Sequence, residues 1–223
     1  MAEAVTSSPY IQPTLKDHIV RFSALIALCA PLGAALAQGS ATPAGAPAMT
    51  PVSMTEAQQI TAAVLPLPAD ARASAKVMGY RNGSPNLVTL REGKVFTCFL
   101  PEADGKRGFH AACYHQSLEP FMARGRALRA SGTKDEQVDT VRFAEVKAGK
   151  LEMPKQPAAM YQLFGGKFDP ATSTITGAQP LFVVYISGAT GATSGLPEKP
   201  VENGMWIMYP GTPKAHIMLT PKM

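Results

Sequence analysis

The sequence lacks the short motifs that usually mark a catalytic or cofactor site. It contains no GxSxG pattern, which is the signal of a serine nucleophile elbow, and no GxxxxGK[ST] or GxGxxG phosphate-binding loop. No CxxC or CxxCH occurs either, so neither a thioredoxin-like redox site nor covalent haem attachment is indicated. The chain therefore gives no direct indication of an enzyme class.

The sequence also lacks an apolar run long enough to span a membrane. Residues 22–37 are nearly all apolar or small, but a spanning helix needs about 20 such residues. Sixteen residues after Arg21, ending in a small–x–small triplet at Ala37, are typical of a secretory signal. We expect cleavage between Ala37 and Gln38. Two alternatives are a translation start at Val20 and an uncleaved membrane anchor.

Cysteines are few, and their number becomes even after cleavage. Cys29 lies within the signal, which leaves Cys98 and Cys113 in the exported chain. An even count in an oxidising compartment favours a disulfide. The bond would close a loop of about 16 residues, worth on the order of 3 kcal/mol. The alternative is two separate buried thiols.

Charge of one sign is only mildly in excess. The chain has 21 Lys and Arg residues against 16 Asp and Glu, a net charge of +5. No dense basic patch with interleaved aromatic residues occurs, so a nucleic-acid partner is not expected. An anionic envelope component is compatible with this charge. The hydrophobic content of 46% indicates a globular protein, and the residues after position 37 suffice for one domain.

The order of patterns along the chain predicts one α+β domain behind a flexible tether. Residues 38–52 are rich in Ala, Pro and Gly and predict the tether, and residues 53–223 predict the domain. We expect a mainly antiparallel sheet with one or two covering helices, without a membrane span. The expected strands are 74–80, 86–91, 94–100, 160–164, 181–186, 206–209 and 215–219.

Helix and loop signals complete this outline. Thr55 is expected to cap a short helix that ends before Pro66, and residues 117–130 form the clearest amphipathic stripe. Residues 135–147 fit a helix, although part of the segment alternates like a strand. Strands 86–91 and 94–100 are expected to form a hairpin. Residues 101–112 and 187–204 are expected to be loops, the first carrying the chain back to Cys113.

Three segments together resemble a family of exported bacterial proteins. They are TLREGKVFTCFLPE followed by Cys113 and an amphipathic helix, the later LFVVYI, and the terminal PGTPKAHIML. The chain is similar to an uncharacterised group that shares a TLREG…TC…P(D/E) segment, a second cysteine and a terminal histidine strand. The resemblance implies pairing of Cys98 with Cys113 and matches His216 to that histidine. It brings no known activity.

Four residues form a candidate site for a divalent metal, although no cofactor is firmly expected. If the helix begins slightly early, His115 and Glu119 stand at i,i+4 on one face, and His110 lies nearby in sequence. His216 lies on the terminal strand. Imidazole and carboxylate groups suit a divalent transition metal. The alternative is that each side chain has a local structural role.

Four aromatic residues form a second candidate site. Tyr161, Tyr185, Trp206 and Tyr209 lie on or beside expected strands near the 187–204 loop, where they could line a small-molecule pocket. Packing in the core explains aromatic residues on strands equally well.

Taken together, the sequence favours an exported protein, periplasmic or extracellular, that acts as a binding or envelope-accessory protein. One alternative is a small metal-dependent or hydrolytic enzyme that uses a His/Glu cluster. Another is a structural interaction module.

Overall fold

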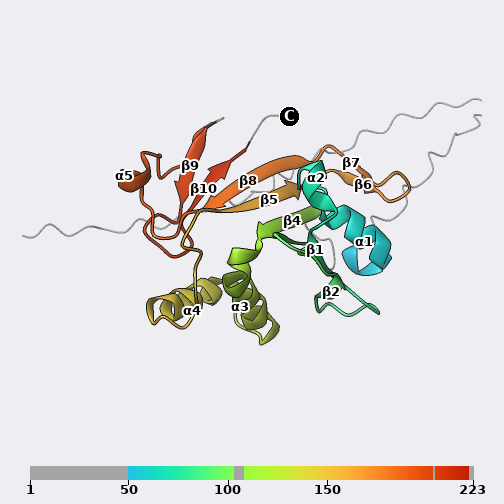
Figure 1. The fold of residues 1–223 in the computed structure, drawn as a ribbon, viewed down its shortest axis with the longest axis horizontal. Helices are drawn as coiled ribbons and strands as arrows, with labels where there is room; N and C mark the ends of the chain where they lie inside the picture. The colour runs from blue at the N-terminus through green and yellow to red at the C-terminus, as the bar shows by residue number, and fades with distance from the viewer. Residues whose placement is uncertain (1–49, 103–107, 203, 221–223) are drawn as a thin grey trace, which may run out of the picture. The chain divides into compact units, whose positions relative to one another are not determined.

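The computed structural model describes residues 50–102, 108–202 and 204–220 (Figure 1). The expected signal peptide and nearly all of the expected tether lie outside these residues. In the part of the chain that is described, no helix is long and apolar enough to cross a membrane. The described residues form a single α+β domain, as the sequence predicts.

A mixed sheet of eight strands is the centre of the domain. Its order is β2-β1-β3-β4-β5-β8-β10-β9, and every neighbouring pair is antiparallel except β1 and β3. A separate two-stranded sheet joins β6 and β7. The strands are β1 (Lys76–Gly79), β2 (Val88–Arg91), β3 (Phe96–Phe99), β4 (His110–His115), β5 (Ala158–Phe164), β6 (Lys167–Asp169), β7 (Thr174–Thr176), β8 (Gln179–Tyr185), β9 (Met205–Met208) and β10 (His216–Leu219).

The expected hairpin of residues 86–91 and 94–100 is wrong, because β1 lies between β2 and β3. After β2 the chain crosses the start of β1, where the Lys94 N–H donates to the carbonyl of Ser74. Gly93 sits so close to β1 that an added Cβ would lie 2.2 Å from the carbonyl carbon of Ala75. This close crossing, which only glycine permits, makes β1 and β3 parallel neighbours.

The helices agree with the sequence more closely. Thr55 caps α1 (Glu56–Ala63) in a reciprocal pair of hydrogen bonds with Gln58. The predicted helix over 117–130 is a 3-10 turn followed by α3 (Glu119–Ala130), and residues 135–147 are helix α4 rather than a strand. The remaining short helices are η1 (Pro51–Ser53), α2 (Ala69–Arg72), η2 (Gln116–Leu118) and α5 (Gly191–Ser194).

The loop expected over residues 101–112 ends earlier than predicted. Residues 110–115 form β4, which lies between β3 and β5 in the middle of the sheet. Ala111, Ala112, Cys113 and Tyr114 are all buried. Both faces of β4 are therefore covered, which removes the polar alternation that usually identifies a strand. The central position predicted for 181–186 is confirmed, since β8 lies between β5 and β10.

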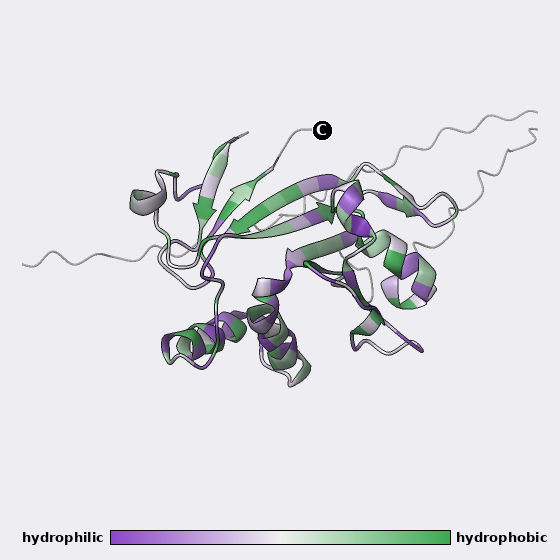
Figure 2. Ribbon diagram, viewed as in Figure 1, coloured by the Kyte–Doolittle hydropathy of each residue, from purple (hydrophilic) through white to green (hydrophobic). Residues whose placement is uncertain are grey.

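Each face of the sheet has its own core. On the face that carries Cys98 and Cys113, which we call the disulfide face, α1 packs Ala62 and Ala63 against the strands. On the opposite face, called the Tyr114 face, Leu118 of η2 packs against Tyr114. In Figure 2 hydrophobic residues run along β8, which belongs to the second core through Val183 and Tyr185.

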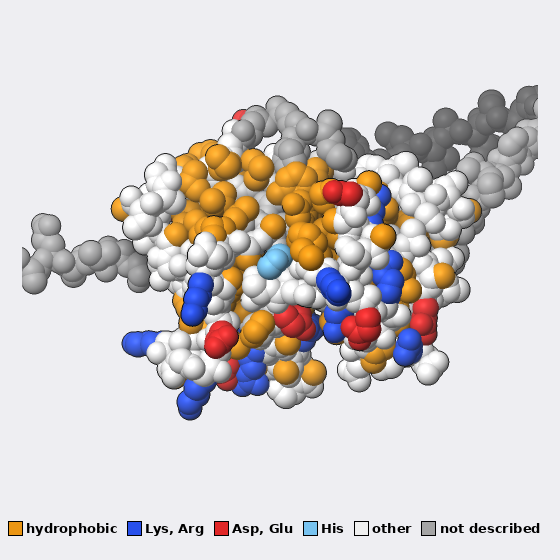
Figure 3. Space-filling view, in the orientation of Figure 1, with side chains coloured by type: hydrophobic (Ala, Val, Ile, Leu, Met, Phe, Trp, Pro, Cys, Tyr) orange, Lys and Arg blue, Asp and Glu red, His pale blue; other side chains and the backbone are white. Residues whose placement is uncertain are grey.

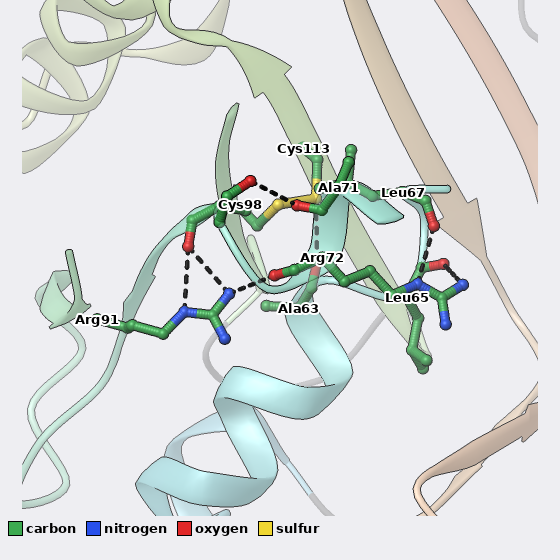
Figure 4. Close-up of a disulfide and its surroundings, with 10 residues drawn as sticks. Ala63, Leu65, Leu67, Ala71, Arg72, Arg91, Cys98 and Cys113 are labelled. Atoms are coloured by element: carbon green, nitrogen blue, oxygen red, sulfur yellow. Dashed lines mark hydrogen bonds between the residues drawn. A yellow bond between two sulfur atoms is a disulfide. The ribbon is translucent and has the colours of Figure 1, made fainter. Parts of the chain in front are cut away.

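The Cys98–Cys113 disulfide joins β3 to β4 at directly opposite positions, with Cα atoms 4.1 Å apart. Both cysteines are fully buried. The Sγ atom of Cys113 lies 3.2 Å from the Ala63 carbonyl oxygen, at the end of α1 (Figure 4). The predicted disulfide is therefore confirmed, and the alternative of two separate thiols is wrong.

Two arginines secure the segment that covers this disulfide. Arg91 of β2 donates to the carbonyls of Arg72 and Ala75, at 2.6 Å and 2.9 Å (Figure 4). Arg72 in turn donates to the carbonyls of Leu65 and Leu67. Because these guanidinium groups serve backbone carbonyls, they have structural roles and do not form an anion site.

Candidate functional site

The structure does not bring the four predicted metal ligands together. His110 is the first residue of β4 and His115 is the last. Five steps along the strand separate them by roughly 16 Å and place their side chains on opposite faces. The expected i,i+4 pairing of His115 with Glu119 is also wrong, because His115 belongs to the strand and only Glu119 belongs to the helix.

His110 contacts a carboxylate and an amide at the far end of β4. Its Nδ1 atom lies 3.0 Å from Oε2 of Glu102, and its Nε2 atom lies 3.0 Å from Oε1 of Gln162. The ring stacks on Phe164 with centroids 4.1 Å apart. Both ring nitrogens therefore already have partners from the chain itself.

His115 and Glu119, the two predicted metal ligands near α3, also have local partners. His115 accepts at Nδ1 from Ser117 N–H at 3.3 Å, and its Nδ1 lies 2.8 Å from Ser117 Oγ. Glu119 accepts from the Tyr114 hydroxyl and from Arg126. Burial raises the pKa of Tyr114 well above its usual value, so this hydroxyl is a donor at neutral pH. Across the described ranges, no three His, Cys, Asp or Glu side chains are grouped to hold a metal.

The four predicted aromatic residues do not line one pocket. Tyr161 pairs with Phe182 and lies on the disulfide face, where it also contacts Phe96. Tyr185 is three residues beyond Phe182 on β8 and therefore projects to the Tyr114 face. Trp206 lies on the Tyr114 face as well. The sequence places the strands but does not show which face each ring occupies.

The structure does gather two of these aromatic rings around His216. The centroids of Tyr185 and Tyr209 lie 5.0 Å and 5.7 Å from the centroid of the His216 ring. His216 is buried, and its Nδ1 atom lies 2.7 Å from the carbonyl oxygen of Lys214. A carbonyl only accepts, so Nδ1 carries the proton and Nε2 carries the lone pair in the neutral ring. Burial lowers the pKa of His216, which keeps the ring neutral at pH 7.

Lys214, which orients His216, is itself held in place. Its ammonium group lies 2.8 Å from Oδ2 of Asp139 and 4.5 Å from the centroid of Tyr209. Asp139 also accepts from Arg142, whose guanidinium lies over the Phe121 ring. Burial alone would raise the pKa of Asp139, but the hydrogen bonds from Lys214 and Arg142 lower it overall. The carboxylate is therefore charged and occupied by two cations.

The pairing of β9 with β10 places four side chains with ligand-binding chemistry in one block. His216 lies opposite Met208, and Met218 lies opposite Trp206. Since alternate residues of a strand share a face, all four project from the Tyr114 face. Met208 is 39% exposed, and Trp206 and Met218 are half-buried. We call His216, Met208, Met218 and Trp206 the β9–β10 block.

Sequence reasoning identifies His216 and Trp206 of this block but misses both methionines. The signal is present as two period-2 pairs, Trp206 with Met208 and His216 with Met218, on strands expected to form a hairpin. Methionine on a strand usually fills a core, so this pattern does not identify a site without the burial of each residue.

Comparisons of this chain with protein-family models, with curated proteins and with solved structures found no match.

Two open hollows have fewer groups suited to binding a ligand than the β9–β10 block. One, of about 440 Å³, is lined by Tyr80, Leu87 and the α3 residues Arg126 and Arg129, among others. Both arginines already have ion-pair partners, at 2.6 Å in each case. The other, of about 380 Å³, lies between residues 154–157 and 186–189 and has Lys155 as its sole charged lining residue. The first hollow therefore has both of its arginines already paired, and the second adds only the polar side chains of Gln156 and Ser187 to its single lysine.

Near α5, backbone donors of the loop after β8 bond within the chain. This loop contains α5, and the Gly191 N–H at the start of that short helix donates to Glu198 at 2.7 Å. Thr190 caps the same turn by accepting from the Thr193 N–H. The negative group at the start of α5 is therefore the carboxylate of Glu198, from the same loop.

Hydrophobic side chains also gather on the surface over β8, β9 and β10 (Figure 3). On the disulfide face of these strands, Phe182, Val184, Ile217 and Leu219 are only half-buried. Patches of this kind are common on binding proteins but do not themselves identify a partner.

Proposed function

We propose that this chain is an exported binding protein of the cell envelope, which holds its ligand at the β9–β10 block. The observation that carries the proposal is the composition of this block. Two thioethers, an indole and an imidazole of fixed tautomer provide binding contacts. The Tyr185 hydroxyl beside His216 is unsuited to act as a general base, since burial raises its pKa to about 12.

The disulfide supports the oxidising compartment that export requires. Cys98 and Cys113 are bonded in the middle of the sheet, and disulfides of this kind persist outside the reducing cytosol. A periplasmic or extracellular location agrees with this bond and with the expected signal over residues 1–37. The anionic envelope partner considered from the net charge has no dedicated site among the described residues.

The hydrolytic alternative has one observation to consider, the contact between His115 and Ser117. The Nδ1 atom of His115 accepts from both the N–H and the hydroxyl of Ser117, two residues later. This is the geometry of a cap at the start of η2. No carboxylate among the described side chains orients the other ring nitrogen, so the pair lacks the third member of a catalytic triad. The contact therefore supports a structural role for His115 and Ser117 more than a hydrolytic one.

Methionine oxidation tests the binding proposal even though the ligand is unidentified. The full-length chain is treated briefly with hydrogen peroxide, alone and in a soluble envelope extract, and each methionine is quantified by peptide mass spectrometry. Met208 and Met205 lie on opposite faces of β9 and are 39% and 49% exposed. Met205 is therefore a matched internal control.

We expect the extract to slow oxidation of Met208 at least threefold relative to Met205. Equal slowing of both residues would reflect consumption of peroxide and would contradict the proposal, as would no change at either. Labelling of Ser117 by a fluorophosphonate would instead support the hydrolytic alternative.

A further inference from the structure

The β9–β10 block has the chemistry of a soft-metal site, and this inference rests on the proposed binding function. Thioether sulfur is a soft ligand that binds Cu(I), and imidazole binds copper as well. We infer that His216, Met208 and Met218 form a three-ligand site for monovalent copper, with Trp206 beside the ion. The four residues differ from the predicted His/Glu set, of which only His216 is retained.

The strand register brings the three ligands within reach of one ion. His216 and Met208 are directly opposite, a position in which Cβ atoms are about 4.5–5.5 Å apart. Met208 and Met218 are diagonal neighbours, for which the separation is about 7–8 Å. The methionine side chain has three rotatable bonds, so it can adapt to Cβ separations of this size. Ligand bonds of roughly 2.0–2.3 Å to nitrogen and sulfur can therefore converge between the two strands.

The outer contacts of His216 are those of a metal ligand. The Lys214 carbonyl accepts from Nδ1, which leaves Nε2 as the ligating atom and fixes the ring orientation. None of the described residues makes a hydrogen bond to Nε2. The carbonyl is held by the turn before β10, where Thr212 accepts from the N–H groups of Lys214 and Ala215.

The charge of the block selects a monovalent ion over zinc. An imidazole and two thioethers supply no negative charge, whereas Zn²⁺ is usually bound by thiolates, carboxylates or several imidazoles. The nearby carboxylate, Asp139, is held by Lys214 and Arg142. Trp206 pairs with Met218 across the two strands, and an indole so near an ion suits a cation–π contact.

The single tryptophan of the sequence makes the test specific to this block. The exported chain, residues 38–223, is purified with its Cys98–Cys113 disulfide intact and is titrated with Ag(I) as a redox-inert probe. The titration is repeated anaerobically with Cu(I) kept reduced by ascorbate. We expect Trp206 emission to change saturably at one ion per chain with both metals, and Zn²⁺ to have no effect.

Variants identify the ligands. Met208→Leu and Met218→Leu should each weaken Ag(I) affinity at least tenfold, whereas Met205→Leu, on the opposite face of β9, should leave it unchanged. Since Met208 is 39% exposed, its replacement by leucine does not endanger the fold. Circular dichroism on each variant checks this point.

Three results would overturn the inference: no emission change in the wild-type chain, unchanged affinity in both ligand variants, or equal weakening in Met205→Leu. The oxidation experiment separates this inference from the proposed function. If the envelope extract still protects Met208 when a Cu(I) chelator is present, the ligand is another molecule and the binding proposal stands without copper.

Discussion

Removal of the disulfide should lower stability by an amount that follows from its position. The bond joins residues 15 apart in sequence, so it closes a loop of about 16 residues. The chain-entropy relation gives about 3 kcal/mol for a loop of this length. The double substitution Cys98→Ala with Cys113→Ala removes the bond without burying new hydroxyl groups. Loss of packing around the two sulfur atoms adds to the effect, because both sites are fully buried.

The corresponding shift in melting temperature is measurable. A domain of this size loses roughly 2–4 °C per kcal/mol, so the double variant should melt about 6–12 °C below the oxidised wild type. Thermal unfolding followed by circular dichroism, on the full-length chain, gives this difference. Wild-type protein in a reducing agent is the matched control, since it keeps both sulfur atoms but lacks the bond.

We expect the reduced wild type to melt close to the double variant and well below the oxidised protein. A difference of under about 2 °C between oxidised wild type and the double variant would refute the reasoning. It would mean that the sheet contacts of β3 and β4 already restrict the unfolded chain or that the bond strains the folded one.

Three further changes have clear expectations. Gln59→Leu removes a buried side chain that bonds three backbone groups, so urea unfolding should show a loss of about 2–4 kcal/mol. The folded state lowers the pKa of Asp139, so this carboxylate stabilises the fold above its unfolded pKa of 3.8 and stops doing so as the pH falls through its folded pKa. Asp139→Asn should therefore be less stable than wild type at pH 7. In acid titrations, its free energy of unfolding should depend less on pH. Gly166→Ala would place Cβ 2.4 Å from the Thr176 carbonyl and should destabilise more than Gly165→Ala, which has open space at a similar positive φ, as differential scanning calorimetry can show.

The helices and the closing hairpin can be predicted from the sequence because their signals are local. The Thr55 cap, the stripe before Ala130 and the alternation around the 210–213 turn each depend on residues a few positions apart. The disulfide is also predictable, since the cysteine count becomes even once residues 1–37 are removed.

The strand order cannot be predicted in this way, because it depends on contacts between distant segments. Nothing local shows that β1 inserts between β2 and β3, since Glu92-Gly93 has the composition of a tight turn. Only the packing of Gly93 against Ala75 reveals the crossing. In the same way, the sequence of β4 predicts a loop because its buried alanines and flanking histidines lack alternation.

The predicted His/Glu site is absent, and the proposed β9–β10 block is assembled, for the same physical reason. Spacing along a chain fixes neighbours within a helix, and His115 with Glu119 would have met only if both were helical. Pairing between strands determines which residues are neighbours in a sheet, so His216 lies opposite Met208 and is not brought to His110 or Glu119. The register of β9 and β10, which single-sequence patterns leave open, determines the composition of the proposed site.

Export is the central claim, since both the disulfide and an envelope ligand require an oxidising compartment outside the cytosol. The most direct measurement is the intact mass of the full-length gene product recovered from the periplasm of a bacterial host. We predict a chain that begins at Gln38, two hydrogen atoms lighter than its reduced form and unreactive to iodoacetamide before reduction. A chain retained in the cytoplasm with residues 22–37 attached, and with alkylatable Cys98 and Cys113, would contradict it.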